Sequence, residues 1–312
     1  KMSERHLPVF SWVLPMHRVN QLLPWGRAHT VPLNNDGSRS GRDLDNLYGR
    51  TKVHIPLTPG EVHFGQLALR KMGVPKDAKY VCFHARDSAY LSSVMPKENW
   101  HYHDFRDSRI ENYLPAVEGL AERGYYCFRM GAVVKNKIQT HHPMIIDYAS
   151  RWRTEFLDMY LSATCHFFIA SGSGIDSVTG VFRRPIVFVN GIPLEYAPSW
   201  DSQFLYIPKK LWLLRERRFL SFREILETGI GRFLESEKYQ KHGIEVLENT
   251  PDEIADVCLE MDERLRGTWS STEEDEALQK RFWGLFPQSH LHGRFLSRVG
   301  ASFLRQNRGL LD

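Results

Sequence analysis

Three polar stretches of the sequence follow short apolar runs and combine residue types that bind phosphate. They are residues 84–87 (His-Ala-Arg-Asp), 129–131 (Arg-Met-Gly) and 171–174 (Ser-Gly-Ser-Gly). The arginines Arg86 and Arg129 can each neutralise a phosphate through paired hydrogen bonds. The Ser/Gly turn leads into a predicted helix whose N-terminus favours an anion, although its glycines could equally serve only the geometry of a tight turn. Together the stretches predict a site for a phosphorylated ligand.

Other polar residues near these stretches have two open interpretations. His84 could orient a base or ribose or take part in proton transfer, and Asp87 could fix Arg86. Asp158, within a predicted helix, is of a type that is ordinarily a solvated acid. His84 and Asp87 could each equally be a structural residue held by hydrogen bonds. For a base that accepts a proton, the sequence offers Asp87, His103 and Asp104.

Two histidine-rich segments have the residue types of metal sites, but we predict no metal cofactor. They are residues 101–104 (His-Tyr-His-Asp) and 141–142 (His-His). Arg106 and Arg109 lie beside the first segment, which favours a polar lid over a cation site. No G-x-G-x-x-G, Walker loop or G-x-S-x-G motif occurs, so the sequence does not support a dehydrogenase, an ATPase or a serine hydrolase.

The elements that must position these residues alternate between strand and helix after about residue 78. Strands are predicted at 79–83, 125–128, 144–146, 167–170, 186–189 and 244–247. Helices are predicted at 61–72, 110–123, 154–164, 175–182 and 251–265, with another beginning at 221–226. This alternation is typical of βαβ units and predicts a doubly wound parallel sheet of the α/β class. Ligands of such sheets bind beyond the carboxyl ends of the strands, where the three polar stretches are expected to meet.

Composition agrees with a globular protein that prefers anionic ligands. Of 312 residues, 42% are hydrophobic and 25% charged, which excludes disordered, collagenous and disulfide-framework chains. The formal net charge of +4 suits phosphates but lacks the dense basic stripe of a nucleic-acid binder. The four cysteines form no C-x-x-C pair, and no apolar stretch is long enough to span a bilayer, so a reduced, cytoplasmic setting is expected.

Two segments of the sequence resemble known glycosyltransferases. Residues 84–87 and 157–174 are similar to the donor-binding half of the GT-B fucosyltransferases, the α-1,6- and protein O-fucosyltransferase group, which carry an H-x-R motif and a later helix-strand-Ser/Gly segment. Residues 113–131 and 147–190, with shorter pieces at 207–209 and 248–251, resemble more closely a family of bacterial surface-polysaccharide glycosyltransferases. The second resemblance extends over about residues 50–310.

The resemblance implies a metal-independent, inverting transfer of a sugar from a GDP- or UDP-linked donor to a glycan or lipid-linked saccharide. By it, His84 and Asp158 would contact the base or ribose, Arg86 the β-phosphate and Ser173 a donor phosphate. Asp87 stands where the fucosyltransferases carry a second basic residue, so the donor could carry another sugar or base. The predicted donor-binding residues are His84, Arg86, Arg129, Gly131, Asp158, Ser171, Gly172, Ser173 and Gly174; the predicted catalytic residues are Arg86, Asp87, His103 and Asp104.

A GT-B enzyme has two Rossmann-like halves, and this chain predicts only one in full. We expect residues 1–77 to form a reduced or partial acceptor-side domain, 78–267 the Rossmann-like donor-binding domain, and 268–312 helices that pack back across the domains. The apolar run at residues 10–25 could touch a membrane surface or pack against further N-terminal structure. Two other functions stay open: a nucleotide-sugar epimerase or pyruvyl transferase on the same fold, and a binding module without chemistry.

Overall fold

The computed structural model describes residues 13–26, 43–289 and 291–312, which belong to two compact units, residues 1–42 and 43–312. In the first unit, helix α1 (Val13–Leu22) exposes more than half of the side chains of Met16, Val19 and Leu22. Residues 10–12 lie outside the described residues, and membrane contact by the run at residues 10–25 stays a prediction.

The second unit is built on a seven-stranded, all-parallel sheet with the order β10-β6-β5-β4-β1-β2-β3. Its strands are β1 (Tyr80–Phe83), β2 (Tyr126–Arg129), β3 (Ile145–Ile146), β4 (Phe168–Ala170), β5 (Ile186–Gly191), β6 (Phe204–Pro208) and β10 (Arg298–Val299). The chain runs outward from β1 to β3 and returns to the opposite side of β1 as β4. This confirms the predicted parallel α/β sheet, and its order is compatible with a Rossmann-like fold.

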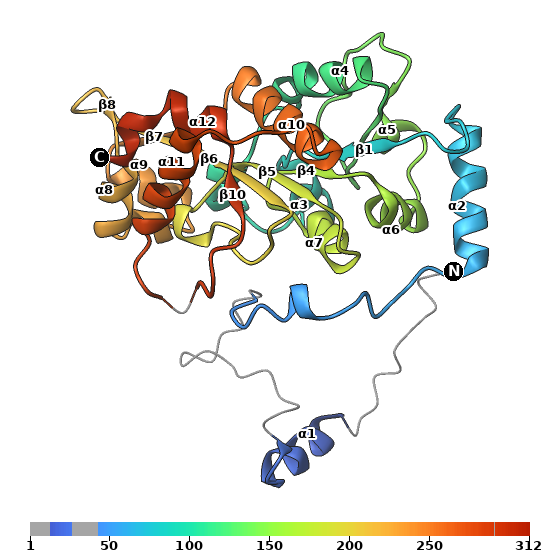
Figure 1. Cartoon of the computed structure of the whole chain (residues 1–312), viewed down its shortest axis with the longest axis horizontal. Coiled ribbons are helices and arrows are strands. Elements are labelled where there is room, and N and C mark those ends of the chain that lie inside the picture. The colour runs from blue at the N-terminus through green and yellow to red at the C-terminus, as the bar shows by residue number, and fades with distance from the viewer. Residues whose placement is uncertain (1–12, 27–42, 290) are drawn as a thin grey trace. The chain divides into compact units, whose positions relative to one another are not determined.

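Helices cover both faces of the sheet, because successive residues of its strands point to opposite sides. In β1, Tyr80 and Cys82 belong to one buried apolar cluster, whereas Val81 and Phe83 belong to the other. The first cluster packs under α2 (Pro59–Lys71), α5 (Tyr148–Arg151), α6 (Glu155–Thr164) and α7 (Gly174–Val181). The second packs under α4 (Leu114–Glu122), α10 (Pro251–Arg266), α11 (Glu273–Gly284) and α12 (Ala301–Gln306), and Figure 1 shows these two layers.

The helices begin at residues whose side chains cap them. Thr154 accepts a hydrogen bond from the backbone N–H of Leu157, as predicted for the start of α6. Thr250 and Glu253 form a reciprocal capping box at α10, whose first residue is Pro251. The predicted helix at residues 110–123 is split, with a 3-10 turn before α4. Pro115 explains this, because it lacks the N–H group that an earlier α-helical turn would need.

The sequence analysis missed four strands, β6, β7 (Lys210–Leu213), β8 (Arg218–Phe219) and β10, and placed one strand in the wrong sheet. The strand predicted at 244–247 is β9 (Ile244–Leu247), and it belongs to a separate three-stranded sheet. In this sheet β7 pairs antiparallel with both β9 and β8. A strand's periodicity gives no information about its partner, so the small sheet could not be distinguished from the large one.

Short helices complete the second unit: α3 (Ala89–Val94), α8 (Phe222–Glu227), α9 (Ser236–Lys241) and the 3-10 helix η4 (His101–Arg106). The tail carries the helices α11 and α12, as expected, but residues 285–289 and 291–297 are not helical and β10 follows them. Helix α2 packs on α6, and Val74 joins the same buried cluster. The predicted domain boundaries at residues 77 and 267 stay a prediction.

A buried pair of asparagines ties the sheet to α10 and gives a test of the fold. Asn190 and Asn249 each donate a backbone N–H to the other's side-chain oxygen, at 2.6 and 2.7 Å, and Asn249 also donates to the carbonyl of Pro208. Asn249→Ala leaves buried groups unpaired, so we expect the free energy of unfolding to fall by about 2–4 kcal/mol. Chemical denaturation measures this. The exposed control Gln240→Ala should change it little; an equal effect of both variants would contradict the assignment.

Candidate functional site

A cavity of about 500 Å³ opens beyond the carboxyl ends of β1 and β4, where the strand order reverses. Ligands of open parallel sheets bind at such a reversal, so the position itself marks a candidate site. We call it the strand-end cavity. It is lined by His84, Arg86, Asp87, Tyr90, Leu91, Trp100, His103, Arg106, Gly131, Ala132, Val133, Asp158, Ser173, Gly174 and Ile175.

Ser171 joins the ends of the two strands instead of lining the cavity. Its hydroxyl oxygen accepts a hydrogen bond from the backbone N–H of Arg86 at 2.8 Å and lies 3.2 Å from the carbonyl of His84, to which it donates. The side chain is 5% exposed. Ser171 therefore fixes where the chain leaves β1, and with it the direction in which Arg86 extends.

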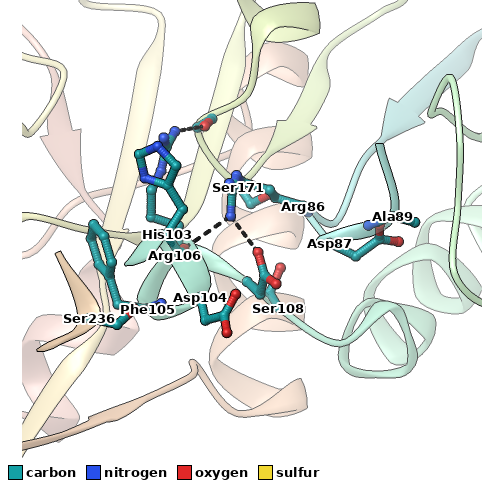
Figure 2. Close-up of polar contacts among 12 residues, drawn as sticks. Arg86, Asp87, Ala89, His103, Asp104, Phe105, Arg106, Ser108, Ser171 and Ser236 are labelled. Atoms are coloured by element: carbon teal, nitrogen blue, oxygen red, sulfur yellow. Dashed lines mark hydrogen bonds and ion pairs between the residues drawn. The ribbon is translucent and has the colours of Figure 1, made fainter. Parts of the chain in front are cut away.

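Two arginines, Arg86 and Arg106, line the strand-end cavity. The Arg86 guanidinium donates to the carbonyl of His103 (Figure 2). It also forms an ion pair with Asp107. Arg106, at the end of η4, donates to the carbonyl of Gly172. Burial and the neighbouring charge of Arg86 lower the pKa of Arg106. A bound anion would relieve this repulsion, so the pair is suited to a phosphate.

The turn from β4 into α7, whose Gly172 carbonyl accepts the hydrogen bond of Arg106, forms another part of the wall. Gly172 has a φ of +72°, a backbone conformation that favours glycine. The carboxylate of Asp176 accepts the N–H of Ser173, so the helix caps part of its own N-terminus, and burial raises the pKa of Asp176 to about 6. The first-turn residues Gly174 and Ile175 line the cavity, and their N–H groups have no carbonyl partner within the helix.

His84 is an uncharged group of this wall. Its Nδ1 lies 3.2 Å from the hydroxyl of Ser173. Burial, reinforced by the positive charge of Arg129, lowers the pKa of His84 to about 4. The ring can therefore exchange hydrogen bonds with a ligand near neutral pH but adds no positive charge. Gly131 lies beside it at a φ of +148°, and a Cβ there would come 2.6 Å from Val134 Cγ1.

Asp158 lines the strand-end cavity, but its carboxylate already has partners within the protein. It accepts a hydrogen bond from the hydroxyl of Tyr148 at 2.8 Å and forms an ion pair with Arg153 at 2.9 Å. Burial raises the pKa of Asp158. These contacts join α5 to α6, so a contact with a base or ribose stays a prediction.

Arg129 faces a different cavity from Arg86. It is 1% exposed, lies 3.4 Å from Asp147, and lines a second cavity of about 620 Å³. Among the described residues, its Nε has no hydrogen-bond partner. The structure thus brings Arg86 together with Arg106, an arginine that the sequence had indicated only as the neighbour of a lid.

The three other catalytic candidates occupy different positions. Asp87 lines both cavities, but its two oxygens accept the N–H groups of Ala89 and Lys135. His103 lines the strand-end cavity, and Figure 2 shows it on the same segment as Asp104, apart from Asp87. Asp104 is half-exposed, pairs with His101 at 2.9 Å and lines the second cavity.

Sequence reasoning missed two further groups that shape the site. Tyr90 and Trp100 line the strand-end cavity, and the ring of Trp100 stacks on that of His103 with an interplanar angle of 7°. Asp107 and Lys209 hold the segment that carries Arg106. The sequence signal near Trp100 and Asp107 was the histidine-rich segment 101–104 beside Arg106 and Arg109, which predicts a polar lid.

Comparisons with family models, curated proteins and solved structures found no significant match. In the described ranges, no three His, Cys, Asp or Glu side chains gather as a metal ion would require. Functional assignment therefore rests on the cavity and the groups that line it.

The pKa of His84 gives a test by acid titration. The unfolded chain binds a proton at this histidine near pH 6.5 and the folded protein only near pH 4, so protonation destabilises the fold as the pH falls through this range. Between pH 7 and 5 we expect the wild type to lose about 2 kcal/mol more stability than His84→Gln, measured by chemical denaturation.

The contributions of Asp107 and Asp176 to the pH dependence of stability cancel when the wild type is compared with His84→Gln. Burial raises the pKa of both to about 6, which stabilises the fold as the pH falls, but it does so in both proteins. Equal pH dependence of the wild type and the variant would show that His84 is not held neutral.

Proposed function

We propose that the strand-end cavity binds the diphosphate of a nucleotide sugar and that the protein is a glycosyltransferase. The observation that carries the proposal is the convergence of Arg86 and Arg106 with the start of α7 on one cavity at the reversal of strand order. Guanidinium groups and free N–H groups at a helix start are the donors that phosphate oxygens prefer. The resemblance of residues 84–87 and 157–174 to the GT-B fucosyltransferases points to the same ligand.

Aromatic side chains at the cavity favour a nucleoside over a simple phosphate ester. Tyr90 and Trp100 offer flat apolar surfaces on which a base can stack, and His84 offers an uncharged hydrogen-bonding group for a ribose or base. A GDP- or UDP-linked sugar satisfies both the arginines and the rings. The acceptor in this proposal is a glycan or lipid-linked saccharide.

The proposed reaction is a single displacement that inverts the anomeric carbon. The bond from that carbon to the β-phosphate oxygen breaks, and its electron pair stays with the nucleoside diphosphate. Arg86 and Arg106 would stabilise this charge, since fixed positive groups placed where negative charge develops lower the barrier most. In this proposal they take the part that a divalent metal plays in other transferases.

The location belongs to the proposal as well. No helix in the described ranges has the length and apolar character needed to cross a bilayer. Cys82, Cys127, Cys165 and Cys258 are buried and unpaired, as suits a reducing compartment. We propose that the protein acts in the cytoplasm, with contact to the inner face of the membrane through residues 10–25.

Binding of nucleoside diphosphates tests the first step. We expect GDP or UDP to raise the melting temperature, because a ligand of the native state alone stabilises it. Arg86→Ala should weaken binding, measured by calorimetry, by about 10- to 100-fold, since hydrogen bonds to charged groups contribute about 1.5–3 kcal/mol. Arg215→Ala, at an exposed arginine far along the chain, is the matched control and should bind as the wild type does.

Turnover distinguishes the alternatives. Release of free nucleoside diphosphate only in the presence of a saccharide supports a transferase, whereas conversion of the donor without release supports an epimerase. Binding without turnover across an acceptor panel supports a binding module. If neither GDP nor UDP binds, or if Arg86→Ala binds as tightly as the wild type, the proposed function is wrong.

A further inference from the structure

The second cavity adjoins the strand-end cavity and is as large. Asp87 lines both, and Arg86 of the strand-end cavity forms its ion pair with Asp107, which lines the second cavity. At the boundary between the cavities, the guanidinium of Arg86 therefore lies on the side of the strand-end cavity and the carboxylate of Asp107 on the side of the second cavity. A transferase needs two substrates that meet at the leaving group, and this boundary is where ligands of the two cavities would meet.

We propose that the second cavity binds the acceptor saccharide and that Asp107 is the base that takes the proton from the attacking hydroxyl. This inference rests on the proposed function and adds to it the acceptor site and a catalytic residue. In the step, the acceptor O–H proton moves to a carboxylate oxygen of Asp107 as the acceptor oxygen bonds to the anomeric carbon. The bond from that carbon to the diphosphate breaks, and the diphosphate keeps the electron pair. Asp107 later returns the proton to water.

The lining of the second cavity suits an uncharged polyol. Both acidic and basic side chains line it, and several are already paired, such as Arg109 with Glu248 at 3.6 Å. Such a surface has little net attraction for an ion but offers many donors and acceptors. Sugar hydroxyls can both donate and accept, so each can be satisfied there.

Asp107 is better placed for the proton than the other carboxylates at the boundary. Asp87 accepts backbone N–H groups on both oxygens, and Asp104 pairs with His101 at the surface. Asp107 accepts a hydrogen bond from Arg86 at one carboxylate oxygen, Oδ1. In the described part of the chain, no hydrogen bond to its other oxygen is found.

The charges around Asp107 set its affinity for a proton. Burial raises its pKa to about 6, the positive charges of Arg86 and Lys209 lower it, and the negative charges of Asp104 and Asp87 raise it. A base of this pKa is unprotonated at neutral pH yet close to the operating range, as efficient proton transfer requires.

The segment that carries Asp107 is held from two sides. The Nζ of Lys209, at the end of β6, donates hydrogen bonds to the carbonyls of Phe105 and Asp107 at 3.1 and 2.6 Å. The hydroxyl of Ser236, on α9, accepts the N–H of Phe105. Asp107 therefore has a fixed place between the cavities, which a base needs if it is to meet a bound hydroxyl.

The test compares Asp107→Asn with Asp107→Glu in the full chain. Binding of GDP and UDP is measured by calorimetry, and release of diphosphate from GDP- and UDP-linked hexoses is measured with methyl glycosides of common hexoses as acceptors. We expect Asp107→Asn to keep nucleoside diphosphate affinity within about threefold while release falls about 100-fold or more, the usual effect of losing a general base. Asp107→Glu should recover part of the rate.

The pH profile separates a base from a residue that only positions Arg86. In the wild type, the rate should fall as the pH drops through about 6, and this acid limb should be absent from the residual activity of Asp107→Asn. Asp77→Asn, at an exposed aspartate, is the matched control and should keep the wild-type rate and profile. Melting curves check that every variant folds.

Three results would overturn the inference. They are an Asp107→Asn variant that releases diphosphate at the wild-type rate, one that loses nucleoside diphosphate affinity as Arg86→Ala does, and a wild type that binds nucleoside diphosphate but transfers to none of the glycosides. The first two leave the proposed function standing. Failure of GDP and UDP to bind at all is a separate result that removes the proposed function itself.

Discussion

The ion pair between Arg86 and Asp107 is the interaction on which the site depends. Arg86 lies just after the end of β1, and Asp107 lies just after η4, about twenty residues later in the chain. The guanidinium is 10% exposed and the carboxylate 28%. A partly buried charge without a partner costs several kcal/mol, so each residue constrains where the other can lie. Together they set the border between the strand-end cavity and the second cavity.

Contacts from distant parts of the chain hold this pair in position. Ser171 at the end of β4 fixes the backbone of Arg86, and Lys209 at the end of β6 fixes that of Asp107. Burial lowers the pKa of Lys209 to about 8, so its charge is retained at neutral pH by a modest margin. All three strand ends lie at one edge because the sheet is parallel. The parallel sheet therefore positions the chemistry as well as burying the core.

The charged residues near the site have two kinds of role, because some line a cavity and others hold the protein's own helices and loops. Arg86 and Arg106 both line the strand-end cavity, and the positive charge of Arg86 contributes to lowering the pKa of Arg106, so the pair is suited to an anion. Arg129, by contrast, is enclosed with Asp147 and faces the second cavity. Asp158 and Asp87 use their oxygens to fix helices and loops. A polar residue after a strand can thus serve a ligand or the scaffold, and its bonded partners decide which.

The sequence alone determined the class of fold and the edge at which a ligand would bind. Alternating apolar runs and helical periods predict a parallel sheet, and residues after strands such as His84, Arg86 and Ser173 then have to lie near its carboxyl edge. Local patterns also predicted helices that begin near Thr154 and Pro251, as α6 and α10 do. These signals are visible because each depends on residues only a few positions apart.

Only the tertiary structure decided which side chains share a cavity. It joined Arg86 to Arg106 and Asp107, separated Arg129 from them, and placed β9 in the small antiparallel sheet. No local pattern contains this information, because strand partners and side-chain directions follow from packing between segments that are far apart in the chain. The residue types that favour an anion are visible in the sequence, whereas the carboxylate beside them became visible only once the ends of β1, β4 and β6 had been brought together.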